Sequence, residues 1–491
     1  MTDAAHPLTL YNSLTRQAEP FQPVHPGEAR VYTCGPTVYN YPHIGNMRAY
    51  VFADVLGRAL SYKGYKLTHV INITDVGHLT DDADAGEDKM EKMARAQSIW
   101  DVAEHYKQAY WADVQALNIR QPARWTVATD YVPQMIAFAQ GIADKHCYEL
   151  DSGLYFDVST VADYGRLARA RTEEGEGRIE AVEGKRNAAD FAIWRKTPLG
   201  EKRQMEWDSP WGRGAPGWHL ECSVMSGEVL GFPFDIHTGG IDHREIHHPN
   251  EIAQNQAHCC TNGLDQPANS GAKVWMHNNF LVERSGKMSK SSGEFLRLQL
   301  LIDKGYHPLA YRLMCLQAHY RSELEFSWEG LSAALTRLKR LVMATPPGTG
   351  EGGHPQAGGG APANNPDGKF RPLLDRFDAA LSDDLNTPVA LTVLEETAAL
   401  KKVDPADKRR VLAGMDAVLG LNLLNLTRAD LRLRPRAAEI TEAEIEETLA
   451  ARKEARAAKD FARSDALRDE LAARGVEVMD GDPLGWDWKL G

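Results

Sequence analysis

The chain has 491 residues, of which 43% are hydrophobic and 25% are charged, and its formal net charge is −12. This length exceeds one hydrophobic core, so we expect about three domains. Six cysteines in so long a chain do not form a disulfide framework, and the first residues lack the basic and apolar regions of a secretory signal. We therefore expect a cytoplasmic protein with reduced thiols and no membrane association. The negative net charge does not indicate nucleic-acid binding, although an acidic protein can bind nucleic acid through a local basic face.

The first predicted elements form a strand, a helix and a second strand. Residues 30–33 are mostly β-branched or aromatic and indicate a short strand that ends at Cys34. From His43 the residues follow an amphipathic helical spacing until Gly64 stops the helix. Residues 66–73 are rich in apolar and β-branched side chains and predict the second strand. A strand–helix–strand unit of this length implies a buried parallel sheet.

The later segments differ in composition. Residues 83–143 are polar and predicted to be rich in helix, whereas 156–211 carry turn signals and are interpreted as part of an insertion. Residues 234–237 indicate another sheet strand. The chain turns helical from Pro308, a residue suited to the first turn of a helix. More than half of residues 345–368 are Gly or Pro, which predicts a linker without fixed structure.

These segments predict an α/β fold: a Rossmann-like parallel-sheet catalytic domain with an inserted connective segment, a helical-bundle domain and a small C-terminal unit. Helices are expected at residues 372–380, 388–401 and 407–419. The predicted domain boundaries are 1–320 for the catalytic domain, about 118–215 for its insertion, 321–344 for a helical stem, 345–368 for the linker, 369–439 for the bundle and 440–491 for the C-terminal unit.

Two short motifs lie far apart in the chain: Pro42-His43-Ile44-Gly45-Asn46 and Lys287-Met288-Ser289-Lys290-Ser291. The first places a histidine and a glycine at a strand-to-helix turn, where backbone N–H groups and the helix dipole favour phosphate. The second places two lysines in a short loop suited to a polyphosphate. Each motif alone is weak, but the pair in this order resembles the two signatures of class I aminoacyl-tRNA synthetases. The pair predicts an ATP-dependent activating enzyme.

Four residues from separate parts of the chain have side chains suited to zinc: Cys34, Cys222, His247 and Glu251. No local CxxC or HExxH spacing marks them, and a single buried cysteine is usually inert. Uncharged core packing rarely needs several imidazoles, so the interpretation is strengthened by a histidine-rich run: His237, His243, His247 and His248.

Longer segments make the resemblance specific. They are Cys34-Gly35-Pro36-Thr37-Val38-Tyr39, Gly217-Trp218-His219-Leu220-Glu221-Cys222, and His247-His248 through Glu251-Ile252-Ala253-Gln254. With the lysine motif, they resemble the cysteinyl-tRNA synthetases over nearly the whole chain. In that family the matched Cys, Cys, His and Glu positions hold one Zn²⁺ that binds the substrate thiolate. The resemblance implies that Cys34, Cys222, His247 and Glu251 are metal ligands. Metal-based selection against serine would make an editing domain unnecessary.

The resemblance also implies substrates and roles. Cysteine, ATP with Mg²⁺ and tRNA(Cys) are the expected partners, and a monomer is expected. The residues expected to bind ATP or stabilise its phosphates are His43, Gly45, Asn46, Lys287 and Lys290, with Lys290 the better match to the family's ATP-binding lysine. The residues expected to form the cysteine pocket are Thr74, Trp218 and His219. Ordinary core packing is the alternative explanation for Trp218.

The sequence departs from the family at two places. Asn46 stands where the family commonly has histidine, so this side chain can donate a hydrogen bond to phosphate but cannot be cationic. Pro249 follows the two histidines that it usually precedes, which predicts that the helix begins near Pro249 and leaves His247 at its cap. His243 and His248 therefore stay open as alternatives for the nitrogen ligand.

The C-terminal unit from residue 440 mixes basic and acidic residues. Charge alone would indicate a solvated helix. Similarity to the family's anticodon-binding unit instead implies that Arg456, Asp465 and Asp480 take part in anticodon reading, with Phe461 as an aromatic residue able to stack on a base.

Three other functions remain open at this point. A zinc- and ATP-dependent ligase that joins cysteine to a small amine would share the chemistry, but it would not need the long C-terminal region. A non-catalytic tRNA-binding paralogue would not need the motif at residues 287–291. A hydrolytic zinc enzyme would need a water position on the metal and a free general base.

Overall fold

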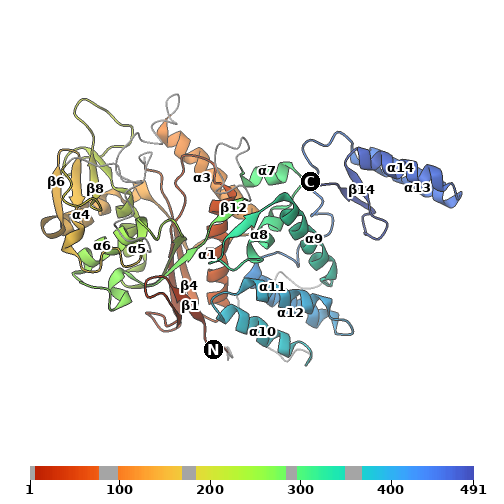
Figure 1. Cartoon of the computed structure of the whole chain (residues 1–491), viewed down its shortest axis with the longest axis horizontal. Coiled ribbons are helices and arrows are strands. Elements are labelled where there is room, and N and C mark those ends of the chain that lie inside the picture. The colour runs from red at the N-terminus through yellow and green to blue at the C-terminus, as the bar shows by residue number, and fades with distance from the viewer. Residues whose placement is uncertain (1–5, 77–97, 169–183, 284–295, 349–367, 491) are drawn as a thin grey trace.

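The computed structural model describes residues 6–76, 98–168, 184–283, 296–348 and 368–490 (Figure 1). Its centre is a parallel sheet of five strands in the order β11-β10-β3-β4-β5. The strands are β3 (Glu28–Thr33), β4 (Lys66–Ile73), β5 (Arg124–Val127), β10 (Phe234–Gly240) and β11 (Ala272–Asn278). The parallel pairing of β3 with β4 confirms the predicted strand–helix–strand unit and the α/β class.

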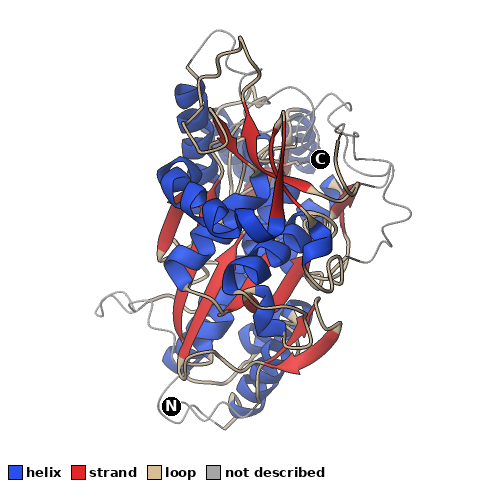
Figure 2. Ribbon diagram, turned by 90° about the vertical axis from the view of Figure 1, so that its left-hand side faces the viewer, coloured by secondary structure: helices blue, strands red, loops and turns tan. Residues whose placement is uncertain are grey.

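Helices lie on both sides of the central sheet (Figure 1). Helix α1 (Ile44–Tyr62) connects β3 to β4 and packs against the sheet from one side. On the other side lie α5 (Trp218–Leu230) and α6 (His247–Cys259), with α4 (Val132–His146) packed against them. Figure 2 shows the strands running between these helices. Because both faces are covered, the last five residues of β4 are all buried, as expected for a parallel strand.

Helix α1 confirms the helix predicted between His43 and Gly64, but it is buried on nearly all sides although its spacing is amphipathic. The three charged residues of this helix, Arg48, Asp54 and Arg58, are at most 9% exposed. Arg58 Nε lies 2.7 Å from Asp54 Oδ2, and Nη2 of Arg312 lies 2.7 Å from the same oxygen. The charges are tolerated because they pair with one another inside the protein.

The inserted unit is a separate antiparallel sheet, β6-β7-β8-β9. Its strands are β6 (Cys147–Leu150), β7 (Gly153–Phe156), β8 (Phe191–Lys196) and β9 (Gly214–Pro216). The expected start of the insertion at residue 118 is too early, because β5 pairs with β4 in the central sheet. Residues 98–143 contain α3 (Ile99–Ala116) and most of α4, as the predicted helix content requires. They also contain β5, which was not predicted because a strand of only four residues has too short a pattern.

The helical bundle follows the central domain. Its helices are α9 (Trp328–Ala344), α10 (Arg371–Ser382), α11 (Thr387–Ala399) and α12 (Pro405–Leu419). The last three confirm the helices predicted from the sequence. Helix α8 (Pro308–Leu316) begins at the predicted proline and packs between α1 and α9. Most of the predicted linker, residues 349–367, lies outside the described residues.

Several short elements complete the catalytic domain: the antiparallel pair β1 (Thr9–Asn12) and β2 (Gln17–Pro20), the parallel pair β12 (Leu281–Glu283) and β13 (Leu324–Phe326), helix α7 (Leu298–Asp303), and 3-10 helices at Ala128–Tyr131, Val158–Thr160 and Pro267–Ser270. The segment after β1 joins the central sheet through a hydrogen bond from Ser13 N to the carbonyl oxygen of Trp275. The backbone N–H of Tyr11 donates to Asp384 in the turn between α10 and α11.

The C-terminal unit contains α13 (Glu442–Ala457), α14 (Phe461–Ala473) and the hairpin β14 (Val476–Val478) and β15 (Trp486–Trp488). It has a small core of its own, formed by Ile440, Ile445, Leu471, Val476, Trp486 and Trp488. Figure 1 shows this unit at the opposite end of the molecule from α5 and α6. In the described ranges, no helix has the length and apolar content needed to cross a membrane.

We expect Asp54→Asn to lower the free energy of unfolding by about 3–5 kcal/mol at pH 7, because the substitution leaves buried guanidinium groups without their carboxylate. Urea unfolding followed by circular dichroism measures this loss. Glu396→Gln is the matched control, since Glu396 pairs with Arg376 at the surface and its loss should cost less than about 1 kcal/mol. A loss for Asp54→Asn as small as that of the control would contradict the prediction.

The same carboxylate gives the effect a pH dependence. Burial alone would raise the pKa of Asp54, but the guanidinium groups of Arg312 and Arg58 outweigh burial and lower the pKa to about 2. Because the pKa is lower in the folded than in the unfolded chain, the stabilisation is present above about pH 4 and is lost as the pH falls through the folded value. The difference between wild type and Asp54→Asn should therefore shrink between about pH 4 and pH 2.

Candidate metal and nucleotide site

The four sequence-predicted metal ligands meet at the carboxyl edge of the central sheet. Cys34 directly follows β3, Cys222 lies in the second turn of α5, and His247 and Glu251 lie in the first two turns of α6. All four are buried, and their ligand atoms lie within 4.8 Å of one another. Cys34 Sγ and Cys222 Sγ are 3.8 Å apart. The sheet makes this meeting possible because the N–H of Cys34 donates to the carbonyl oxygen of Thr238 on β10.

Helix α6 begins at His247, two residues earlier than the position of Pro249 predicted. Proline is tolerated in the first turn because the backbone N–H groups of that turn have no partner within the helix. His247 and Glu251 therefore share one helix face, and His247 Nε2 lies 2.9 Å from Glu251 Oε1. The i,i+4 relation that the proline had put in doubt is present.

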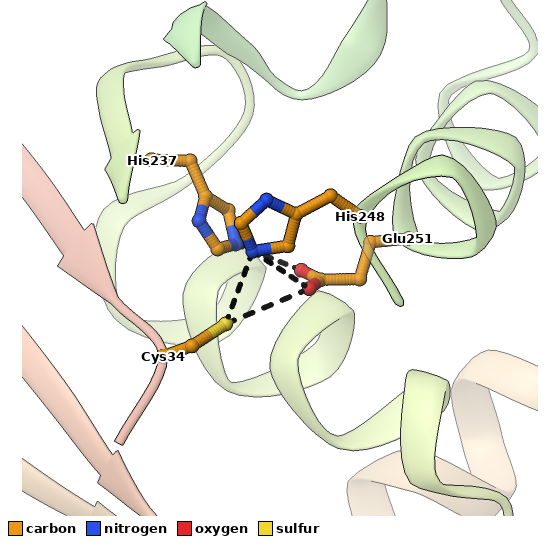
Figure 3. Close-up of side chains that lie close together, drawn as sticks. All are labelled: Cys34, His237, His248 and Glu251. Atoms are coloured by element: carbon orange, nitrogen blue, oxygen red, sulfur yellow. Dashed lines mark hydrogen bonds and ion pairs between the residues drawn. The ribbon is translucent and has the colours of Figure 1, made fainter. Parts of the chain in front are cut away.

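A second group of possible ligands overlaps the first (Figure 3). Figure 3 shows Cys34, His237, His248 and Glu251 pointing toward one another. His248 Nε2 lies 3.3 Å from Cys34 Sγ and 3.9 Å from Glu251 Oε1. His237 Nε2 lies 2.8 Å from Glu251 Oε2. His237 was part of the histidine-rich run but was not predicted as a ligand, and its position on β10, beside the end of β3, is the signal that could have identified it.

The histidines have different surroundings. His248 Nδ1 lies 2.8 Å from His277 Nε2, and His277 Nδ1 lies 2.9 Å from the Ser13 hydroxyl. His243, the other alternative left open by the sequence, belongs to neither group of ligands found among the described residues. Gly239 makes room for these rings, because a Cβ there would lie 2.7 Å from His248 Cε1 and 2.8 Å from His243 Nδ1.

Burial and neighbouring charges set the protonation of the first group. For Glu251, burial alone would raise the pKa, but His237 and His247 outweigh it and hold the pKa well below its ordinary value. For His247, burial alone would lower the pKa, and the Glu251 carboxylate instead raises it to about 10. The pocket therefore stabilises a carboxylate and an imidazolium close together, a charge arrangement that a bound cation would replace.

The two cysteines behave as an asymmetric pair. Burial raises the pKa of Cys34 well above its ordinary value, and the neighbouring Cys222 raises it further. Burial would also raise the pKa of Cys222, but hydrogen bonds from Cys34 and His247 lower it to about 6. The surroundings therefore favour the thiolate form more at Cys222 than at Cys34.

The three predicted pocket residues lie near the candidate metal ligands. The Trp218 ring is 4.3 Å from the His247 ring between centroids. His219 Nδ1 lies 3.0 Å from His247 Nδ1, so a shared hydrogen bond orients the His247 ring. The Thr74 hydroxyl donates to Glu221 Oε2 at 2.9 Å. Trp218 and His219 thus contact His247, and Thr74 contacts the residue that precedes Cys222.

The first signature begins helix α1. His43 is the N-cap, and its Nδ1 accepts a hydrogen bond from the N–H of Gly45 at 3.0 Å. Asn46 Oδ1 accepts from the N–H of His43 at 3.1 Å, which completes a capping box. In a neutral ring that accepts at Nδ1, the proton lies on Nε2. Donors toward a phosphate would therefore be His43 Nε2 and Asn46 Nδ2.

Lys287 and Lys290 lie outside the described residues, which stop at Glu283 and resume at Leu296. The described residues on either side lie near the start of α1. The N–H of Ile44 donates to the carbonyl oxygen of Leu296 at 2.8 Å. A Cβ on Gly45 would lie 3.6 Å from Leu281 Cβ.

The four predicted anticodon residues lie in the C-terminal unit, far from the metal ligands (Figure 1). Phe461 begins α14 and is 63% exposed. Arg456 Nη1 lies 3.2 Å from Asp480 Oδ2, and Arg452 pairs with both oxygens of the same carboxylate. Asp465 lies 3.4 Å from Arg468. The described structure therefore brings Arg456 and Asp480 together and leaves the Phe461 ring at the surface.

Comparisons with known proteins agree with this architecture. Residues 20–336 match a family model described as the tRNA synthetases class I (C) catalytic domain, and residues 441–483 match the cysteinyl-tRNA ligase anticodon binding domain. The chain is 81% identical to a cysteine–tRNA ligase of Novosphingobium aromaticivorans, over 99% of this chain and 97% of that protein. It is 54% identical to the cysteine–tRNA ligase of Zymomonas mobilis, over 100% of this chain and 99% of that protein.

Solved structures show the same fold at low sequence identity. The agnB2 LeuRS of Agrobacterium radiobacter K84, in a ternary complex with tRNA and LeuAMS, has a TM-score of 0.53 at 13% identity, covering 82% of this chain and 84% of that chain. A methionyl-tRNA synthetase of Mycobacterium tuberculosis, in complex with methionyl-adenylate, has a TM-score of 0.50 at 13% identity, covering 80% and 90%. The family models and the full-length relatives together show that this chain belongs to the cysteine–tRNA ligase family of class I tRNA synthetases.

Proposed function

We propose that the protein is a cysteine–tRNA ligase, which activates cysteine with ATP, releases pyrophosphate and transfers the cysteinyl group to the terminal ribose of tRNA(Cys). The proposal rests on the buried group of Cys34, Cys222, His247 and Glu251 at the edge of a sheet whose neighbouring helix begins at His43. A soft-metal site for a thiol and a helix N-terminus for phosphates then serve one reaction. Similarity to cysteine–tRNA ligases of two organisms supports it.

We assign one zinc ion to the group that contains Cys222 rather than to the group that contains His237 and His248. The first group offers two sulfur ligands, the type for which zinc competes best. Two thiolates bound about 2.3 Å from a tetrahedral ion lie about 3.8 Å apart, which is the Sγ–Sγ distance of Cys34 and Cys222. A zinc ion held by these residues would supply a soft Lewis acid that prefers a thiolate to a neutral hydroxyl, which would favour cysteine over serine.

Two of the remaining histidines, His237 and His219, then support the proposed ligands. His237 holds the second oxygen of Glu251, and His219 holds the second nitrogen of His247. Hydrogen bonds of this kind fix the orientation of metal ligands and tune their basicity. Trp218, which packs on His247, and Thr74 are proposed to line the space that receives the cysteine side chain.

The start of α1 is proposed to hold the phosphates of ATP. His43 Nε2 and Asn46 Nδ2 are donors there, and Gly45 lets the backbone approach the nucleotide. Lys287 and Lys290 are proposed to neutralise the charge that develops on the leaving pyrophosphate, with Mg²⁺ accompanying ATP. The carboxylate of cysteine attacks the α-phosphate, so the protein contributes positioning and charge stabilisation rather than a covalent intermediate.

The C-terminal unit is proposed to read the anticodon. The exposed ring of Phe461 offers a face for stacking, and the Arg456–Asp480 pair and Asp465 supply polar groups near the same helices. We propose that the enzyme acts in the cytoplasm as a monomer.

The proposal predicts stable labelling of tRNA when total tRNA is incubated with ATP and labelled cysteine, and no stable labelling with labelled serine. Acid-precipitable counts measure both. Cysteine-dependent ATP–pyrophosphate exchange without tRNA labelling would instead indicate a ligase for a small amine. Binding of tRNA without exchange would indicate a non-catalytic paralogue.

We expect Cys222→Ala to remove the bound zinc, which is one ion per chain in the wild type, and to reduce selection of cysteine over serine toward the roughly 10- to 200-fold that shape alone provides. Metal emission spectroscopy and parallel activation assays measure the two effects. Cys259→Ala is the matched control, because Cys259 is exposed at the far end of α6. Full zinc content in Cys222→Ala would contradict the assignment of Cys222 as a ligand.

Adjacent histidines allow the two ligand groups to be separated. His247→Ala should lose zinc, whereas His248→Ala should retain about one ion per chain, because only His247 belongs to the group with both cysteines. Metal content is measured on protein purified without added zinc, together with far-ultraviolet circular dichroism to verify folding. The reverse pattern would assign the ion to the Cys34, His237, His248 and Glu251 group.

A further inference from the structure

Arg48 lies in the second turn of α1, after the residues of the first signature, and is only 2% exposed. Its guanidinium donates to backbone carbonyl oxygens of four residues: Asn279, Phe280, His319 and Ser322. The Nη1 distance to Asn279 O is 2.8 Å and the Nη2 distance to Ser322 O is 2.6 Å. A guanidinium has five N–H donors in a rigid planar fork, so it can span several carbonyl groups that a lysine ammonium cannot reach together.

The four carbonyl groups belong to two segments that lead into paired strands. Asn279 and Phe280 immediately precede β12, and the segment from His319 to Ser322 precedes β13. The two segments also bond to each other, since the N–H of Asn279 donates to Tyr320 O and the N–H of Leu324 donates to Phe280 O. Arg48 therefore ties the start of this two-stranded sheet to α1.

This sheet is in contact with the first turn of α1. Leu281, the first residue of β12, lies against Gly45, as the 3.6 Å distance from its Cβ to a Cβ built on Gly45 indicates. The Tyr311 hydroxyl donates to the carbonyl oxygen of Ile44 at 2.6 Å from α8. The position of the proposed phosphate-binding turn thus depends on β12 on one side and α8 on the other.

The helical bundle also holds the 319–322 segment, through Asp384 in the turn between α10 and α11. Asp384 accepts hydrogen bonds from the Tyr320 hydroxyl and from Arg321 Nε, both at 2.7 Å. Asp384 and Leu385 are consecutive non-glycine residues with positive φ, 50° and 57°. Such a backbone is unfavourable for residues that carry a Cβ, so it persists only where the surrounding contacts require it. Tyr320 also stacks on Phe52 of α1, with ring centroids 4.4 Å apart.

We propose that Arg48 is a positioning residue for ATP: by fixing β12 and the 319–322 segment, it holds the first turn of α1 in the geometry that the phosphates require, and Asp384 braces the same segment from the bundle. This inference rests on the proposed function, because it assigns ATP to that turn. Arg48 acts through Leu281 and the backbone of 279–280 rather than through the nucleotide.

Arg48→Lys is the test and Arg58→Lys is its matched control. Arg58 is a buried arginine of the same helix whose donors go to Asp54, Ala417 O and Asn118 O, away from β12. In cysteine-dependent ATP–pyrophosphate exchange, Arg48→Lys should lower kcat/KM for ATP by about 10- to 100-fold, the effect of a small displacement of binding groups. KM for cysteine and the zinc content should stay at wild-type values, and Arg58→Lys should leave KM for ATP unchanged.

Asp384→Asn keeps the test valid if Arg48→Lys does not fold, since it weakens the brace while leaving Arg48 in place. It should also lower kcat/KM for ATP, through a higher KM. The loss of kcat/KM in the double variant should be smaller than the product of the two single losses. Equal losses of ATP and cysteine efficiency in Arg48→Lys and Arg58→Lys would overturn the inference, because they would indicate only a structural role.

Equilibrium dialysis with MgATP separates this inference from the proposed function. Binding of ATP to the wild type with weaker binding to Arg48→Lys supports the inference, even if charging of tRNA fails. Equal binding to both overturns the inference alone. A wild-type protein that binds no ATP overturns the proposed function and this inference together.

Discussion

Enclosure of α1 is the constraint on which the rest of the structure depends. The charged side chains of this helix are buried, so protein groups must satisfy each one. Asp54 meets the guanidinium groups of Arg58 and Arg312, and Arg48 meets four carbonyl groups. Arg312 comes from α8 and also donates to Leu419 O at the end of α12. The contacts that pair the buried charges of α1 therefore also fix the helical bundle to the catalytic domain.

The candidate metal site depends on sheet order rather than on local sequence. Cys34 follows β3, and α6 follows β10, its neighbour in the sheet, so residues more than 200 positions apart meet at one edge. That edge is where ligands bind in parallel α/β sheets, because the loops and helix N-termini there leave polar groups available. Cys34 and Glu251 belong to both ligand groups. A metal ion held by either group would therefore contact these two residues.

The parts of the fold that could be predicted are those with strong local signals. The pattern of β3, α1 and β4 and the proline-initiated α8 could be read directly from residue spacing, whereas the four-residue β5 could not. The ligand types were available from composition and resemblance. The sequence could not decide between His247 and His248 as the nitrogen ligand. These adjacent residues at the start of α6 both bring Nε2 within 4 Å of Glu251 Oε1. The burial of Arg48, Asp54 and Arg58 was missed because charged residues in a helix ordinarily face solvent.

The partners of the N-terminal hairpin have a consequence for synthesis on the ribosome. Residues 9–13 bond to β11 near residue 275 and to the turn at Asp384. At about 5–20 residues per second, the first strand waits roughly 20–75 s before its last partner has been translated. Until then β3 also lacks its neighbour β10. The nascent chain must keep these early strand edges unpaired without aggregating, a period in which chaperones would be most needed.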